Sequence, residues 1–169
     1  MSLVGQKIPD TEFSHVPWSD ELSNAAACGI PEKYRTTQKF AGKKVVIVSV
    51  PGAFTPTCHG NHIPGFVKKA SEFKQKGYEV IVLASNDPFT MSGWRTALGA
   101  KGELEFASDL NLEFSKALNA TVDMTKAGFG VRGARYALIA DDNVIKAFDS
   151  EESPGNVGVS SAEAVFGKL

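Results

Sequence analysis

A run of β-branched residues that ends in a proline-containing loop and a cysteine is the feature that most constrains how this chain folds. Residues 45–50 read Val-Val-Ile-Val-Ser-Val, which is typical of a strand buried on both faces of a sheet. The loop of residues 51–57 leads into Cys58, and residues 57–76 have helical spacing. We therefore expect Cys58 at the end of a buried strand, in or beside the first turn of a helix.

A cysteine in this position is expected to be reactive. Unpaired N–H groups and the dipole at the start of a helix favour an anion, and the thiolate is the nucleophilic form of cysteine. Thr55 lies three residues before Cys58, so its hydroxyl is within reach of the sulfur or of a bound oxygen. Pro51 is expected to fix the loop and keep water from the sulfur. Arg135, which enters a buried strand, is the candidate positive partner.

The rest of the chain alternates between strand-like and helix-like segments. An irregular arm over residues 8–40 fits short strands and loops. Pro64 falls inside the expected helix and predicts a kink there. The further strands expected are 79–84, 104–107, 135–140 and 144–148, the last two as a hairpin, and the further helices are 88–98, 109–118 and 160–169. This pattern predicts one α/β domain over residues 1–169, with a mixed central sheet covered by helices on both faces in a thioredoxin-like arrangement.

Composition excludes several classes of function. The formal net charge is −1 at pH 7 and no Lys/Arg cluster is present, which argues against nucleic acid or an anionic membrane as the main partner. No apolar run approaches the roughly 20 residues that span a bilayer. Two cysteines and no signal-peptide core favour a reducing compartment, and we expect the cytoplasm. The tripeptide Gly167-Lys168-Leu169 is close to a peroxisomal address, which makes peroxisomal import the alternative.

The motif around Cys58 resembles that of a known family. Residues 51–58 read Pro-Gly-Ala-Phe-Thr-Pro-Thr-Cys and closely resemble the type II peroxiredoxins. The resemblance continues through residues 62–66, 85–89, 107–109 and 135–138 and covers nearly all of the chain after residue 40. Residues 27–31 and the tail from Pro154 look most like the fungal members, which include allergen-type, peroxisomal-membrane-like and alkyl hydroperoxide reductase proteins.

The resemblance implies a thiol peroxidase that uses no metal or organic cofactor. Cys58 would be the peroxidatic cysteine, which attacks hydrogen peroxide or an alkyl hydroperoxide and becomes a sulfenic acid. Thr55 would hydrogen-bond the thiolate and the peroxide, Arg135 would stabilise thiolate and transition state, and Pro51 would shield the sulfur. Members of the family are reduced by thioredoxin or by glutathione-linked systems such as glutaredoxin.

The chain departs from part of the family at its second cysteine. Some members resolve the sulfenic acid with a cysteine near the C-terminus, but residues 158–161 here read Gly-Val-Ser-Ser. Cys28 resembles the cysteine that, in certain fungal relatives, joins the peroxidatic cysteine of a second subunit. This predicts a homodimer with interchain resolution by Cys28. The alternative is a buried, inert Cys28, in which case an external thiol reduces a one-cysteine enzyme.

Other residues have more ordinary interpretations. We expect His62 to be a hydrogen-bonding residue beneath the active loop and His59 to face solvent. Arg95 and Arg132 are alternative positive partners for Cys58, and otherwise Arg95 belongs to a surface salt bridge. Phe54, Phe89 and Trp94 are expected to pack together or to line an apolar pocket or interface, and Gly128-Phe129-Gly130 to be a turn.

Two functions of other classes are weighed against the peroxidase. A thiol-disulfide oxidoreductase normally needs a Cys-x-x-Cys pair, and Thr55 occupies the place of the first cysteine. A redox sensor would pass the oxidation of Cys58 to a partner protein, a role compatible with peroxidase activity.

Overall fold

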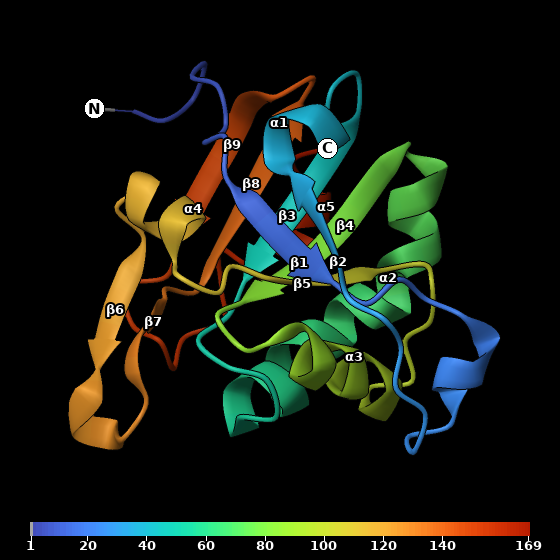
Figure 1. Ribbon diagram of the computed structural model, residues 1–169. Coiled ribbons are helices and arrows are strands. Elements are labelled where there is room, and N and C mark those ends of the chain that lie inside the picture. The colour runs from blue at the N-terminus through green and yellow to red at the C-terminus, as the bar shows by residue number, and fades with distance from the viewer. Residues whose placement is uncertain (1) are drawn as a thin grey trace.

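The computed structural model describes residues 2–169 and is built around a seven-stranded mixed sheet (Figure 1). Strand β3, which precedes Cys58, pairs parallel with β4 and antiparallel with β8, so it lies in the interior of the sheet. From edge to edge the strands are β2 (Glu32–Arg35), β1 (Glu12–His15), β5 (Glu105–Ser108), β4 (Tyr78–Ala84), β3 (Lys44–Ser49), β8 (Tyr136–Asp141) and β9 (Val144–Ser150).

Strand β3 is buried on both faces, as its continuous apolar sequence predicts. Successive side chains of a strand point to opposite faces. Val46 and Val48 belong to one apolar core, whereas Val45 and Ile47 belong to the core on the other face. The strand that leads to Cys58 is therefore anchored from both sides.

Helices cover both faces of the sheet, which confirms the expected layers. Helices α2 (Ile63–Gln75), α3 (Pro88–Ala97) and α5 (Ala162–Phe166) contribute to the core that contains Val46. The opposite core is covered by the shorter helices α1 (Thr36–Lys39) and α4 (Glu113–Ala117).

The helix expected over residues 57–76 consists of two types of helix. Residues 56 and 57 are helical, the π-helical segment η2 (Cys58–His62) follows, and α2 then continues to Gln75. Pro64 lies in the first turn of α2, where the missing N–H of a proline costs little. The wider turn of η2 lies immediately before Pro64, and the kink expected at Pro64 stays a prediction.

Side-chain caps start two of the helices. The carboxylate of Asp87 accepts from the backbone N–H groups of Phe89 and Thr90, both at 2.9 Å, at the start of α3. The hydroxyl of Ser161 accepts from the N–H of Ala164 at the start of α5. Helix α5 ends before the expected end at the last residue.

Helix α4 begins later than predicted. The sequence places its start at Asp109, but α4 starts at Glu113. The buried carboxylate of Asp109 accepts instead from the N–H groups of Phe114 (3.2 Å) and Ser115 (2.9 Å). Asp109 therefore satisfies first-turn donors from outside the helix.

Two hairpins complete the fold, of which the sequence predicts one. Strands β8 and β9 pair through Asp142 and Asn143, which both have positive φ, as expected. A second hairpin, β6 (Thr121–Met124) and β7 (Gly130–Gly133), was not expected and extends from the body of the molecule (Figure 1, orange). The predicted turn at residues 128–130 lies within it.

The N-terminal arm has the short elements expected of it. It contains β1, the 3-10 helix η1 (Asp20–Ser23), β2 and α1. Over residues 2–169, none of the helices combines the length and the apolar character needed to cross a membrane.

Candidate active site

The loop before Cys58 is fixed by contacts with neighbouring elements. Its first amide, that of Val50, donates to the carbonyl of Leu83 in β4 at 2.9 Å. The N–H of Ala53 donates to Asn86 Oδ1 at 2.9 Å, and Arg132 Nη1 donates to the carbonyl of Pro51 at 3.2 Å. The loop thus delivers Cys58 to a defined place, with its side chain 1% exposed.

Arg135 brings its guanidinium to the sulfur. It lies immediately before β8, is 2% exposed, and donates from Nη2 to Cys58 Sγ at 3.3 Å. Its Nε and Nη2 also donate to the carbonyl of Pro154, at 3.1 Å and 2.7 Å. These contacts hold a positively charged group directly beside the Cys58 sulfur.

His62 lies beneath this contact, as expected. Its Nδ1 is 2.9 Å from Arg135 Nη1, and its Nε2 is 2.8 Å from the carbonyl oxygen of Ser160. Burial lowers the pKa of His62 to about 4, with a further lowering by the charge of Arg135. The ring is therefore neutral at physiological pH.

Arg135 has no carboxylate partner in the part of the chain that the structure describes. None of the ion pairs found in residues 2–169 includes it. The contacts with Pro154 and His62 give each of its three nitrogens a neutral acceptor but supply no negative charge. The Cys58 sulfur is the remaining hydrogen-bond partner of the guanidinium among the contacts found in residues 2–169.

A cavity of about 260 Å³ opens onto the sulfur and joins the residues predicted to form the site. Thr55 lines it, but its hydroxyl donates to the carbonyl of Gly52 at 2.8 Å rather than to Cys58. The rest of the wall is mainly apolar. The lining includes Cys58, Thr55, Pro51, Arg135, Met124 and Phe129.

Comparisons with known proteins agree with this geometry. The model of the Redoxin family matches residues 3–166. A protein of Malassezia furfur named as a peroxiredoxin is 48% identical over 98% of this chain and 94% of its own length. The chain belongs to the peroxiredoxin family.

Further relatives support the same assignment. A Lipomyces kononenkoae protein named as a peroxisomal peroxiredoxin is 43% identical over 95% of this chain and 96% of its own. The structure of reduced Prx3 of Vibrio vulnificus in complex with H₂O₂ has a TM-score of 0.84 and 33% identity, and the match covers 99% of this chain and 95% of that one. These matches confirm the thioredoxin-like fold and the resemblance to the atypical peroxiredoxins, and they identify this peroxiredoxin as a peroxidase.

The second cysteine lies apart from the cavity at Cys58. Cys28 is exposed, so the alternative of a buried Cys28 is wrong. It lines a separate cavity of about 100 Å³ with Phe89 and residues of α3. Both cysteines of this peroxiredoxin are free thiols in the structure.

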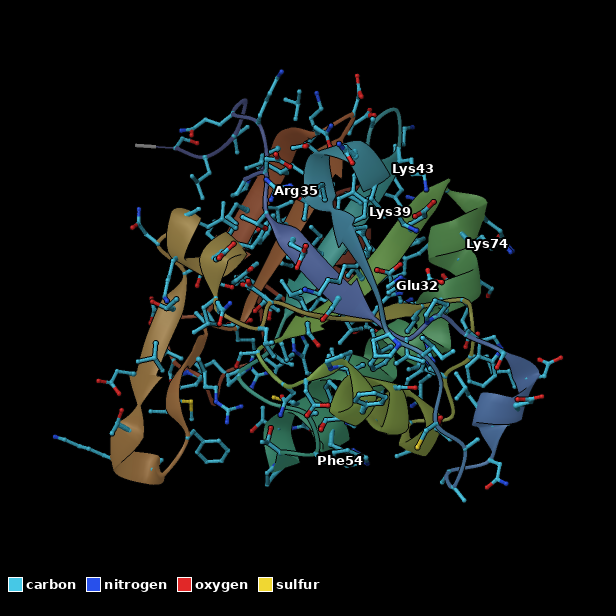
Figure 2. The ribbon with its side chains drawn as sticks, viewed as in Figure 1. Glu32, Arg35, Lys39, Lys43, Phe54 and Lys74 are labelled. Carbon is cyan, nitrogen blue, oxygen red and sulfur yellow. The ribbon has the colours of Figure 1, made fainter. Side chains whose placement is uncertain are left out.

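The positions of two basic residues differ from prediction. His59 is half-buried rather than solvent-facing, because its Nδ1 accepts from Trp94 Nε1 at 3.0 Å and its ring stacks on Phe54. Phe54 itself is 54% exposed and has positive φ (Figure 2). Arg95 is buried rather than in a surface salt bridge, and it donates to the carbonyl of Val16 at 3.1 Å.

Sequence reasoning missed four residues of this site. Met124 and Phe129 come from the unexpected β6–β7 hairpin, whose only sequence signal is a short alternation over residues 121–124 followed by two glycines. Pro154 and Ser160 accept hydrogen bonds through their backbone carbonyls. Every residue has such a carbonyl, so the residue type gives no signal for this role.

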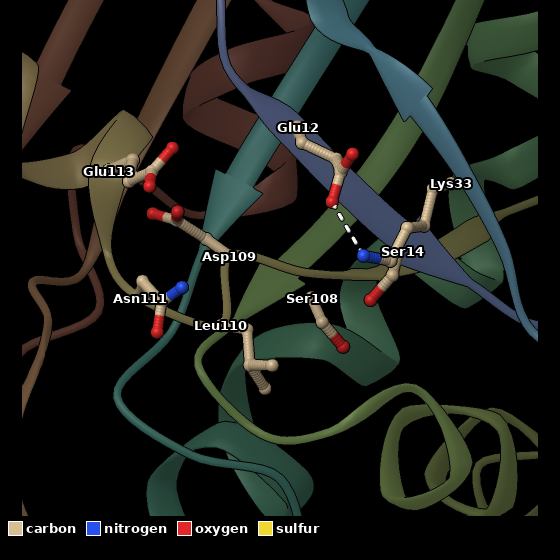
Figure 3. A pocket seen from close by; sticks show the side chains of 8 residues that line it. All are labelled: Glu12, Ser14, Lys33, Ser108, Asp109, Leu110, Asn111 and Glu113. Atoms are coloured by element: carbon tan, nitrogen blue, oxygen red, sulfur yellow. Dashed lines mark ion pairs between the residues drawn. The ribbon is translucent and has the colours of Figure 1, made fainter.

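A third cavity, of about 110 Å³, lies on the β1–β2–β5 side of the sheet (Figure 3). An ion pair between Glu12 and Lys33 (2.9 Å) spans part of it. Its lining contains neither cysteine nor histidine, so it offers no thiol chemistry. Within residues 2–169, no three His, Cys, Asp or Glu side chains are arranged to hold a metal ion.

Proposed function

We propose that this peroxiredoxin reduces hydrogen peroxide and alkyl hydroperoxides through Cys58. The thiolate attacks the terminal oxygen, an S–O bond forms as the O–O bond breaks, and the leaving oxygen takes up a proton to give water or an alcohol. The sulfur loses the two electrons that the O–O bond gains and becomes a sulfenic acid. The observation that carries the proposal is the 3.3 Å contact between Arg135 Nη2 and Cys58 Sγ in a buried site.

Arg135 supplies the stabilisation that the reaction needs. Negative charge moves from the sulfur to the leaving oxygen during the attack. A guanidinium already held beside the sulfur by neutral acceptors requires little reorganisation to follow that charge. Arg135 therefore favours both the thiolate and the transition state.

Thr55 and Pro51 orient and shelter the substrate in this proposal. Because the Thr55 hydroxyl donates to the Gly52 carbonyl, its lone pairs are free to accept from the O–H of a hydroperoxide. That hydrogen bond would turn the terminal oxygen toward Cys58. Pro51 offers a ring and no N–H group, so it limits water at the sulfur without competing for the substrate.

The cavity supports alkyl hydroperoxides as substrates beside hydrogen peroxide. Met124 and Phe129 give it an apolar wall on the side of the β6–β7 hairpin. An apolar group attached to the hydroperoxide would lose contact with water there, which favours its binding.

We propose that Cys28 of a second subunit resolves the sulfenic acid. The attack of its thiolate forms an interchain disulfide and releases water, and thioredoxin then reduces the disulfide. Its exposure supports this role. The alternatives are direct reduction of a one-cysteine enzyme by glutathione or glutaredoxin, and a peroxide sensor that passes its oxidation to a partner.

We also propose a cytoplasmic location, with the peroxisome as the alternative. Two free thiols suit a reducing compartment, and a relative named as peroxisomal supports the alternative. Fluorescence microscopy of the tagged full chain separates the two.

The central test is the rate at which Cys58 is oxidised by peroxide, measured by stopped-flow. Cys58→Ser is expected to abolish the reaction. Arg135→Ala should slow it on the order of 10²-fold, the usual effect of removing one donor to a developing charge. Arg35→Ala, which removes an exposed arginine paired with Asp10, is the matched control and should react normally. An undiminished rate for Arg135→Ala would remove Arg135 from the mechanism.

A further inference from the structure

Arg135 contacts Cys58 through Nη2, while its Nη1 contacts His62. We propose that His62 is a positioning residue that aims the Arg135 guanidinium at the sulfur and is itself held by Ser160 and Glu151. The inference rests on the proposed role of Cys58 and Arg135. His62 is 2.9 Å from Arg135 Nη1, and it is not within hydrogen-bond distance of the sulfur among the contacts found in residues 2–169.

The contact with Ser160 fixes the tautomer of the ring. A carbonyl oxygen only accepts, so His62 Nε2 must carry the proton that it donates to Ser160 at 2.8 Å. In the neutral ring Nδ1 then has a lone pair. That lone pair accepts from Arg135 Nη1, so each nitrogen of the imidazole has a defined role.

Glu151 holds the acceptor in place. Its Oε1 accepts from the N–H of Gly158 (2.7 Å), the N–H of Ser160 (2.9 Å) and the hydroxyl of Ser160 (2.8 Å). Burial raises the pKa of Glu151, but the hydrogen bonds from Ser160 and Gly158 outweigh it, and the pKa lies below its usual value. Glu151 is thus a carboxylate, and Ser160 is fully buried against His62.

The other hydrogen bonds of the Arg135 guanidinium do not fix its orientation by themselves, so His62 is needed to fix it. The carbonyl of Pro154 takes donors from Nε and Nη2, on one side of the group. Nη1 lies on the other side, with His62 as its acceptor. Loss of that acceptor would leave a buried donor unsatisfied, and the guanidinium would turn away from its present contact with Cys58 to find another.

The positioning requires a neutral imidazole. A protonated His62 would present an N–H group to the Nη1–H of Arg135, which replaces an attraction by a repulsion. The charged groups that face His62 are Arg135, before β8, and Glu151, after β9. A chain of hydrogen bonds therefore links residues 151–160 to the reacting sulfur. It runs from Glu151 through Ser160, His62 and Arg135 to Cys58.

Substitution of His62 tests the proposal with two readouts, the rate of Cys58 oxidation by hydrogen peroxide and the pH midpoint of Cys58 alkylation by an uncharged reagent. His62→Leu should slow oxidation about tenfold and move the alkylation midpoint to higher pH. His62→Asn, which can place an amide oxygen near the position of Nδ1, should retain more of the rate than His62→Leu. His15→Leu, at a buried histidine on β1, should leave both readouts unchanged.

A double-substitution cycle separates this inference from the proposed function. If His62 acts through Arg135, His62→Leu should add little to the effect of Arg135→Ala. Full additivity, or a folded His62→Leu variant with the wild-type rate and midpoint, would overturn the positioning role. A wild-type rate in Arg135→Ala would instead overturn the proposed function.

A measurement on the unmodified protein covers the case in which the His62 variants do not fold. Nitrogen-15 NMR of the imidazole at pH 7 should show a protonated Nε2 and an unprotonated Nδ1 for His62. A protonated Nδ1 would contradict the proposal, because that nitrogen would no longer accept from Arg135.

Discussion

At the scale of the residue, the proposed chemistry depends on an arginine whose hydrogen-bond partners in residues 2–169 include no carboxylate. Pro154 and His62 are neutral acceptors, so Arg135 is well placed but uncompensated. Cys58 is the one neighbour of the guanidinium, among its hydrogen-bond partners in residues 2–169, that gains a negative charge by losing a proton. In the proposed mechanism the group beside the reacting sulfur is therefore this guanidinium.

The buried imidazole predicts acid sensitivity. His62 has a pKa of about 4 in the folded chain, against about 6.5 when unfolded, so the unfolded chain binds the proton more readily. Stability from the neutral ring is complete above about pH 6.5 and is lost as the pH falls through 4, by up to about 3 kcal/mol. Urea unfolding at pH 7, 5.5 and 4.5 measures this loss.

The control for this prediction is a variant without the titrating ring. His62→Gln should show a shallower decline of the unfolding free energy between pH 6.5 and pH 4.5 than the wild type. An equally steep decline would assign the acid sensitivity to other groups.

At the scale of the element, the sequence predicts the helices and strands that have a clear residue pattern within or beside them. It does not predict the elements that lack such a pattern. The apolar run of β3 and the cap at Asp87 have signals within a few residues of the element. The β6–β7 hairpin has only four residues in each strand and little apolar content, so its pattern is weak. The π-helical segment at Cys58 also has no local signal that distinguishes it from an α-helix.

The β6–β7 hairpin should influence which peroxides the enzyme prefers. Phe129→Ala removes an aromatic ring from the cavity wall and is expected to slow oxidation by cumene hydroperoxide on the order of tenfold more than oxidation by hydrogen peroxide. Phe89→Ala, which removes an exposed aromatic residue outside this cavity, is the control. Equal slowing for both peroxides would show that Phe129 does not select the substrate. Paired stopped-flow measurements with the two oxidants supply the ratio.

At the scale of the whole molecule, the site depends on contacts between distant parts of the chain. Arg135 and Cys58 are 77 residues apart, and His62 and Ser160 are 98 apart. Periodicity describes single elements and does not pair them. The entry of Arg135 into a buried strand made it the candidate partner, and the resemblance to the family supported that choice over Arg95. Neither periodicity nor the family resemblance indicated the carbonyl partners at residues 154 and 160. The single domain over residues 1–169 stays a prediction.

The same scale includes the proposed dimer. Treatment with one equivalent of peroxide should give a disulfide-linked dimer on non-reducing electrophoresis, because Cys28 is exposed on one subunit and reacts with Cys58 of another. Cys28→Ser and Cys58→Ser should each abolish the band. Persistence of the dimer in Cys28→Ser would exclude Cys28 as the resolving residue.

The enclosure of the Cys58 sulfur limits which molecules can react with it. A small oxidant enters the cavity as it stands, whereas another protein cannot bring its own cysteine to an atom that lies beneath the surface. We therefore expect exchange with a macromolecular thiol to require opening of the wide helical turn over residues 58–62. Oxidation of Cys58 by peroxide and its reduction by a partner protein would thus take place in two different conformations of the chain. The rate of opening would set the lifetime of the oxidised sulfur.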